Sequence, residues 1–127
     1  MEVVRRTYEA WNARAMDTLR ECYDPGAVLV LGSEGGPEAA EAIVGIDALM
    51  LLYARLREAW DTDEIEPISF TDADDRVVVH YFWRVRGRGT DLDIEQAIIC
   101  TLSQGRISRV EPFWNHNEAL KAAGLEE

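Results

Sequence analysis

The chain has 127 residues, and 47% of them are hydrophobic, which is enough for one domain with an apolar core. Its formal net charge of −11, from 24 acidic and 13 basic residues, argues against binding to nucleic acids or anionic membranes. The apolar runs are far shorter than the roughly 20 residues that cross a bilayer. The N-terminus lacks a secretory apolar stretch and the only cysteines are Cys22 and Cys100, so we expect a cytoplasmic protein.

Helices dominate the first half of the chain. Apolar residues at helical spacing predict two short helices, the second of which ends at Tyr23. A buried strand over 27–31 and a loop over 32–37 come next, and the glycines and proline of that loop suit a segment that covers a pocket. A longer helix follows, with an apolar stripe over 49–60.

The second half changes to a period of two. This pattern predicts strands over 65–71, 76–87, 92–103 and 106–114. Turn residues separate these segments, so we expect hairpins and a mostly antiparallel sheet, followed by a short helix beginning near Glu118. Helices first and strands afterwards predict an α+β domain whose helices pack on one face of the sheet.

Three segments carry a resemblance to a known family. They are Tyr8 to Arg14, Cys22 to Val28, and the tail from Gly105 to Leu125, which joins a strand, a polar corner and a capped helix. In these segments the chain resembles the SnoaL-like branch of the nuclear transport factor 2-like superfamily. The resemblance spans nearly the whole chain and implies a single SnoaL-like domain over 1–127. It also implies a cystatin-like α+β roll, in which a cone-shaped, curved, mostly antiparallel sheet wraps around three N-terminal helices and leaves a cavity at the open end.

Strand periodicity indicates which side chains face that cavity. The more apolar face of 76–87 includes Tyr81 and Trp83, and the same parity turns Gln96 inward on the next strand. The expected ligand-binding residues are Tyr8, Trp11, Tyr53, Tyr81, Trp83, Gln96, Ile98, Trp114 and Asn115. Simple core packing is the alternative interpretation of each aromatic residue. Gln96 is the expected hydrogen-bonding residue, because a buried amide needs a partner.

The superfamily's ketosteroid isomerases use a helix tyrosine, a strand aspartic acid and a second aspartate as a base. The resemblance places these roles at Thr7, Ile98 and Leu31. Leu31 has no basic atom to remove a proton, and Ile98 has no donor to stabilise an enolate. We therefore do not expect isomerase chemistry of this type.

SnoaL-like polyketide cyclases need an acid–base residue above a hydrophobic slot, and His116, beside Asn115, is the catalytic candidate. An imidazole titrates near neutrality, with an ordinary pKa of about 6.5, so it can exchange a proton in either direction. Many relatives carry Trp-Asp where this chain has Trp114-Asn115, so a carboxylate is missing here. The alternative is that Asn115, His116 or Asn117 caps the terminal helix, since asparagine is a preferred cap residue.

We expect neither a metal nor a cofactor. His80 and His116 could share a metal with Glu34, Glu95 or Glu111, but no paired histidine spacing or Cys/His cluster supports this.

Apolar residues on the outer face of the predicted sheet indicate a homodimer. Val78, Phe82, Ala97 and Ile99 lie on the side that the helices leave uncovered, and an exposed apolar patch usually marks an interface. His80 shares their parity, so we expect it at the surface or in that interface.

Three functions stay open at this point. The first is a small polyketide cyclase-like or related proton-transfer enzyme acting on an apolar carbonyl compound through His116, Gln96 and a pocket tyrosine. The second is a noncatalytic protein that binds a hydrophobic small molecule, and the third is a dimeric interaction module. The fold cannot choose among them, or decide whether the chain is an enzyme. The absence of a carboxylate at Leu31, Ile98 and Asn115 favours the second.

Overall fold

The computed structural model describes residues 2–31, 41–87 and 89–125. Its helices are α1 (Glu2–Asn12), α2 (Met16–Glu21), α3 (Ile46–Glu58) and α4 (His116–Ala122). Its strands are β1 (Tyr23–Leu31), β2 (Glu41–Val44), β3 (Thr62–Ala73), β4 (Arg76–Gly87), β5 (Thr90–Ser103) and β6 (Arg106–Phe113). No helix in this part of the chain is long and apolar enough to cross a membrane.

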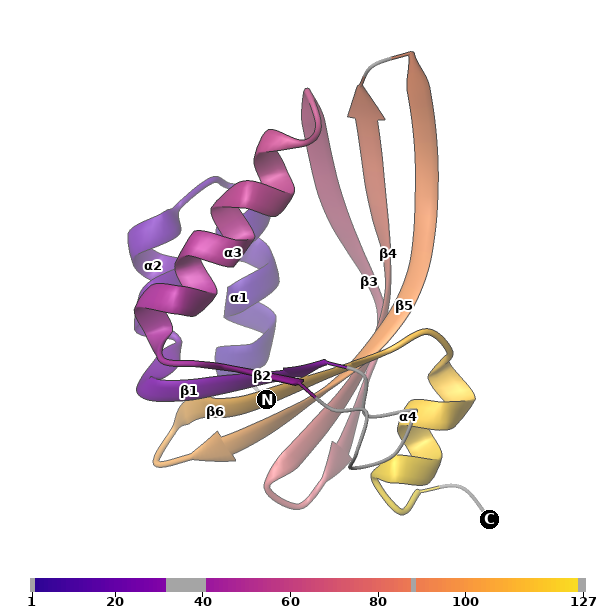
Figure 1. The fold of residues 1–127 in the computed structure, drawn as a ribbon. Coiled ribbons are helices and arrows are strands. Elements are labelled where there is room, and N and C mark those ends of the chain that lie inside the picture. The colour runs from indigo at the N-terminus through magenta and orange to yellow at the C-terminus, as the bar shows by residue number, and fades with distance from the viewer. Residues whose placement is uncertain (1, 32–40, 88, 126–127) are drawn as a thin grey trace.

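The strands form one curved, open sheet in the order β2-β1-β6-β5-β4-β3. Neighbouring strands are antiparallel except β1 and β6, which run parallel. Helices α1, α2 and α3 lie on one side of the sheet, and α4 lies on the other (Figure 1). The predicted α+β fold, with a bent and mostly antiparallel sheet around three helices, is confirmed.

The main core lies between the concave side of the sheet and these three helices. Each helix contributes a side chain that is at most 2% exposed: Val4 from α1, Leu19 from α2 and Leu49 from α3. Full burial of one such side chain stabilises a domain by about 1.5–3 kcal/mol. The helices are thereby held on the concave side, which fixes the position of the cavity described below.

Several elements differ from the prediction in their bounds, and one strand was not predicted. Tyr23, expected at the end of the second helix, instead begins β1 and pairs with Ile107 of β6. Strand β2 was not predicted, because it has four residues and three are exposed, which leaves no alternating apolar pattern. The loop expected over 32–37 lies outside the described residues.

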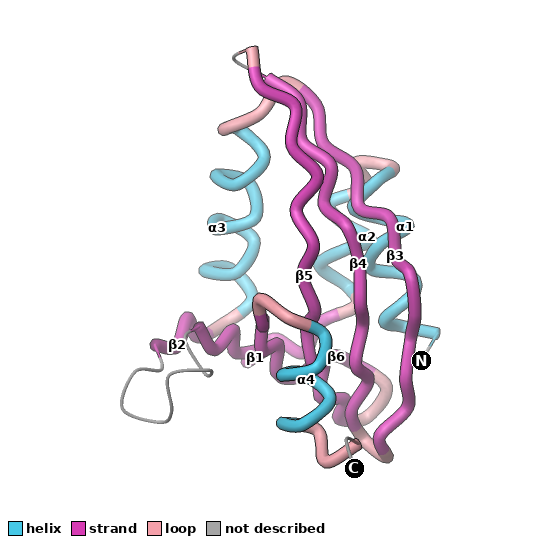
Figure 2. The backbone as a smooth tube through the Cα atoms, turned by 90° about the vertical axis from the view of Figure 1, so that its right-hand side faces the viewer, coloured by secondary structure: helices cyan, strands magenta, loops and turns pink. Residues whose placement is uncertain are grey.

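The position of α4 contradicts the prediction that the outer face of the sheet is uncovered. Figure 2 shows α4 on the opposite side of β4 and β5 from α1, α2 and α3. Val78 and Ala97 are fully buried and Ile99 is 1% exposed, because they pack against Ala119 and Ala123 on α4 and beside it. The expectation that these three residues form an exposed patch is wrong. The unbroken apolar run over 77–79 already signals a strand that is covered on both faces.

Candidate functional site

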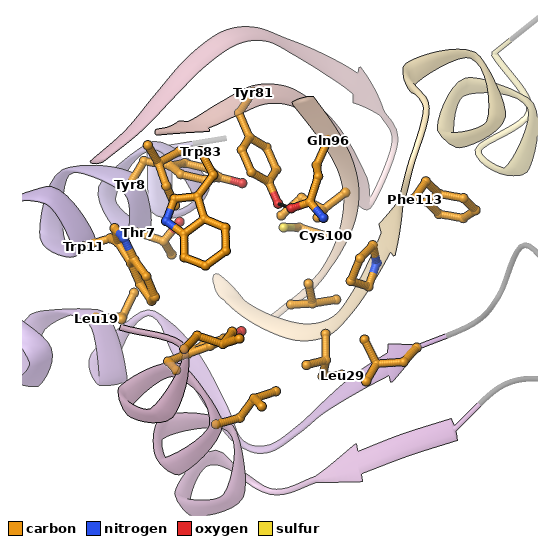
Figure 3. A pocket seen from close by; sticks show the side chains of 18 of the residues that line it. Thr7, Tyr8, Trp11, Leu19, Leu29, Tyr81, Trp83, Gln96, Cys100 and Phe113 are labelled. Atoms are coloured by element: carbon orange, nitrogen blue, oxygen red, sulfur yellow. Dashed lines mark hydrogen bonds between the residues drawn. The ribbon is translucent and has the colours of Figure 1, made fainter. Parts of the chain in front are cut away.

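A cavity of about 500 Å³ opens between the concave side of the sheet and the helices. Figure 3 shows side chains from β4 and β5 pointing into it, opposite residues of α2 and β1. It is lined by Thr7, Tyr8, Trp11, Leu19, Tyr23, Leu29, Leu31, Leu52, Tyr53, Leu56, Ile65, Tyr81, Trp83, Gln96, Ile98, Cys100, Val110, Pro112, Phe113 and Trp114.

The structure brings together all but one of the residues expected around a ligand. The expected residues that line the cavity are Tyr8, Trp11, Tyr53, Tyr81, Trp83, Gln96, Ile98 and Trp114. Thr7, Leu31 and Ile98, the positions that correspond to the isomerase roles, line it as well. Trp114 is 71% exposed, so it lies where the cavity meets solvent. Whether these residues bind a ligand stays a prediction.

Several polar atoms of the wall are tyrosine hydroxyls. The Tyr81 hydroxyl donates to Oε1 of Gln96 at 2.9 Å, and the hydroxyls of Tyr23 and Tyr53 lie 3.3 Å apart. Burial raises the pKa of all these hydroxyls, that of Tyr53 to about 12. Burial likewise raises the pKa of the Cys100 thiol to about 12. These groups therefore carry no charge at neutral pH.

Behind the wall, Asp63 on β3 holds two indoles of the cavity in place. The carboxylate is 2% exposed, and its Oδ2 accepts from Nε1 of Trp11 at 2.6 Å and from Nε1 of Trp83 at 2.8 Å. Its Oδ1 accepts from Arg14 Nη1 and Arg57 Nε, both at 3.0 Å. The Arg57 guanidinium also lies over the Trp11 ring, 4.2 Å from its centroid. Asp63 thus fixes the orientation of two large rings that a ligand would contact.

The hydrogen bonds keep Asp63 ionised although it is buried. Burial alone would raise its pKa, but the hydrogen bonds from Trp83, Trp11 and Arg14 and the charge on Arg57 outweigh burial and lower the pKa. A carboxylate whose acceptor sites are occupied in this way is a structural group and not a proton acceptor.

The sequence prediction missed Asp63 because it began this strand at residue 65. Asp63 shares the inward parity of Ile65, which lines the cavity, whereas the exposed Glu64 lies between them. Extending the strand by two residues would have placed an acidic side chain on an apolar inward face, and such a group must find partners. An acidic residue at an inward position was thus the feature of the sequence that could have pointed to Asp63.

Asn115, expected on the cavity wall, lies elsewhere. Its side-chain oxygen accepts a hydrogen bond from the backbone nitrogen of Glu118 at 3.2 Å and caps α4. The capping alternative is thus confirmed for Asn115, and its expected position in the cavity is corrected. The physical reason is local, because an asparagine before a helix satisfies a backbone N–H that has no partner within the helix.

His116 is absent from the cavity lining as well. It begins α4, and its ring stacks on His80 with the centroids 4.4 Å apart. Strand parity predicted that His80 points away from the cavity, and the stack places His116 beside it on that outer face. The pKa of His116 is lowered, first by burial and then by the neighbouring His80, while Glu95 opposes both. Nε2 of His80 also lies 2.7 Å from Oε2 of Glu95.

Among the described residues, no group of three or more His, Cys, Asp or Glu side chains is arranged to hold a metal ion. Glu34, one of the carboxylates considered with the two histidines, lies outside the described residues.

Comparison with known proteins identifies similar sequences and folds. A model of the SnoaL-like domain matches residues 4–110. An uncharacterised protein of Mycobacterium tuberculosis is 26% identical over 117 residues, which cover 90% of this chain and 87% of that protein.

Among solved structures, a protein from a soil-derived mobile gene cassette has a TM-score of 0.76 and 25% identity, covering 88% of this chain and 86% of its own. TerC, co-crystallised with polyporic acid, has a TM-score of 0.75 and 18% identity, with 97% and 96% covered. A Sinorhizobium meliloti protein provisionally described as a polyketide cyclase has a TM-score of 0.71 and 23% identity, with 89% and 94% covered.

Proposed function

Because the chain belongs to the SnoaL-like domain family, we propose that its cavity is the functional site and binds a flat, apolar small molecule without transforming it. The observation that carries this proposal is the wall of the cavity. Every described side chain that lines it is uncharged, and most are aliphatic or aromatic. Its volume of about 500 Å³ lies within the range of roughly 300–1,000 Å³ typical of small-molecule sites.

Proton transfer needs a group that titrates near the working pH. No Asp, Glu, His, Lys or Arg occurs among the described lining residues, and the Cys100 thiol and the Tyr53 hydroxyl have pKa values of about 12. A proton-transfer role of His116 stays a prediction. Its place on the outer face of the sheet gives it no position on the cavity wall. Binding is therefore the function that this site supports best.

The relatives are in keeping with a small-molecule ligand. TerC, which shares this fold, was crystallised with polyporic acid. The likeness to TerC concerns the fold, so the ligand class proposed for this chain depends on its own cavity wall.

Two neighbouring leucines on α3 offer a matched test. Leu52 lines the cavity, whereas Leu51 is 54% exposed and is absent from the lining. Leu52→Trp fills part of the cavity, and we expect it to weaken binding of a flat aromatic ketone at least tenfold in isothermal titration calorimetry. Leu51→Trp makes the same change outside the cavity and leaves the affinity unchanged. Equal affinities in both variants, or no heat of binding with the wild type across a panel of flat ketones and phenols, would contradict the proposal.

We also propose that the protein is a cytoplasmic homodimer. Cys22 and Cys100 are both unpaired and buried, as suits a reducing compartment. Since α4 covers most of the apolar patch on the outer face, the dimer contact depends on Phe82. Arg84, which shares the parity of Phe82 on β4, pairs with Glu66 and Asp93 within the chain, so we do not expect the contact to depend on its charge.

A further inference from the structure

The polar atoms of the cavity wall differ in whether the protein satisfies them. The hydroxyl of Thr7 donates to the carbonyl oxygen of Val4, and the indoles of Trp11 and Trp83 donate to Asp63. The hydroxyls of Tyr23 and Tyr53 face each other, and the hydroxyl of Tyr81 donates to Gln96. Each of these hydroxyls and indoles therefore has a polar partner within the protein.

Two polar groups on the wall lack a partner among the described residues. The Tyr8 hydroxyl is buried without a hydrogen bond, in a side chain that is only 6% exposed. The amide of Gln96 uses its oxygen for Tyr81, which leaves its nitrogen as a free donor. Of these two groups the Tyr8 hydroxyl is the buried one. A buried polar group without a hydrogen bond costs about 1–3 kcal/mol, so a native structure normally supplies it with a partner.

Both groups lie at the same end of the cavity. The ring centroids of Tyr8 and Tyr81 are 5.8 Å apart, and the hydroxyl of Tyr81 reaches Gln96. Figure 3 shows Tyr8, Tyr81 and Gln96 gathered on one side and Leu29 of β1 across the cavity from them. Burial keeps the Tyr8 hydroxyl protonated, since it raises the pKa of this group well above its ordinary value. The polar end therefore offers hydrogen-bond donors, and Leu29 offers aliphatic surface across the cavity from them.

We propose that the Tyr8 hydroxyl and the Gln96 amide nitrogen select the ligand by donating hydrogen bonds to a neutral acceptor, such as a ketone oxygen, at one end of an otherwise apolar molecule. This inference rests on the proposed binding function and names the class of ligand. An anionic group is disfavoured, because the described lining residues include no cation to pair with it. The guanidinium groups of Arg14 and Arg57 lie behind the wall and are bound to Asp63.

Three probes of nearly the same shape test this selection. They are fluorene, fluorenone, which adds a ketone oxygen, and fluorene carboxylate, which adds a negative charge. We expect the wild type to bind fluorenone about tenfold more tightly than fluorene, the ratio that one hydrogen bond of about 1.4 kcal/mol supplies. Fluorene carboxylate should bind more weakly than either.

Tyr8→Phe and Gln96→Leu should each reduce the ratio of the two affinities severalfold while leaving the affinity for fluorene nearly unchanged. Thr7→Val is the matched control, because it removes a hydroxyl of the same cavity wall that donates to the carbonyl oxygen of Val4, and it should preserve the ratio. Circular dichroism shows whether each variant is folded.

The outcomes separate the two proposals. If the wild type binds fluorene and fluorenone equally well, or if neither Tyr8→Phe nor Gln96→Leu changes the ratio, the selection is refuted and the binding function stands. If neither fluorene nor fluorenone binds, the binding function fails, and the inference that rests on it fails too.

Discussion

Asp63→Asn is the change that most directly probes how the cavity wall is built. It removes the charge that pairs with Arg57, whose side chain is 9% exposed, while Arg14 is 51% exposed. Removing one partner of a buried ion pair costs about 3–5 kcal/mol, whereas an exposed pair is worth about 0–1 kcal/mol. The asparagine keeps one acceptor oxygen for an indole, so we expect a loss near the lower limit, about 3 kcal/mol. A domain of this size has about 5–15 kcal/mol of stability, so the variant should still fold.

Urea unfolding followed by circular dichroism at pH 7 measures this loss. Glu64→Gln is the matched control, because Glu64 is an exposed neighbour on the same strand, and such changes usually stay within about 0.5 kcal/mol. If Asp63→Asn unfolds within 0.5 kcal/mol of the wild type, the carboxylate does not hold the wall together, and the reasoning is refuted.

The same variant makes a prediction about pH. The pKa of Asp63 is lower in the folded chain than its ordinary value of about 3.9, so its contribution is complete above that value and is lost as the pH falls through the folded pKa. The difference in unfolding free energy between wild type and Asp63→Asn should therefore be constant near neutrality and shrink below about pH 4. A difference that stays constant down to pH 2 would contradict this assignment.

Three other predictions concern α4 and the outer face. Asn115→Ala should cost about 1 kcal/mol in urea unfolding because it removes the cap, and Asn117→Ala, an exposed residue without a capping bond, should cost less than half of that. His116 has a lowered pKa when folded, so its contribution is complete above its ordinary pKa of about 6.5 and is lost as the pH falls from there. The Tm of the wild type should consequently fall more between pH 7 and pH 5 than that of His116→Phe, and parallel curves would contradict a lowered pKa of His116 in the folded chain. Light scattering at micromolar concentration should give twice the chain mass of 14.4 kDa for the wild type and the single mass for Phe82→Glu, and a monomeric wild type would refute the dimer.

The sequence predicted the cavity wall well because the direction of a strand side chain is a local property. The alternation along 76–87 was enough to turn Tyr81 and Trp83 inward, and the same parity turned Gln96 and Ile98 inward on the next strand. The alternative reading of Asn115 as a cap succeeded for the same reason, since a cap depends on residues three positions apart.

The rest depends on contacts between distant segments. Asp63 meets Trp11, 52 positions away, and Arg14, 49 positions away, so no local pattern could assign it the role of holding the wall. The position of His116 depends on how the chain crosses the sheet after β6, and only the packing of α4 on Val78 and Ala97 decides that. Periodicity predicted which side chains of a strand share one face of the sheet, but not which later segment of the chain would cover that face.

A crystal structure of the protein with fluorenone would test the central claim that the cavity binds a neutral, flat, apolar molecule. We predict density for the ketone inside the cavity, against the rings of Tyr53 and Trp83, with its oxygen within hydrogen-bonding distance of Nε2 of Gln96. A cavity without the ketone in crystals that carry it elsewhere on the surface would contradict the claim.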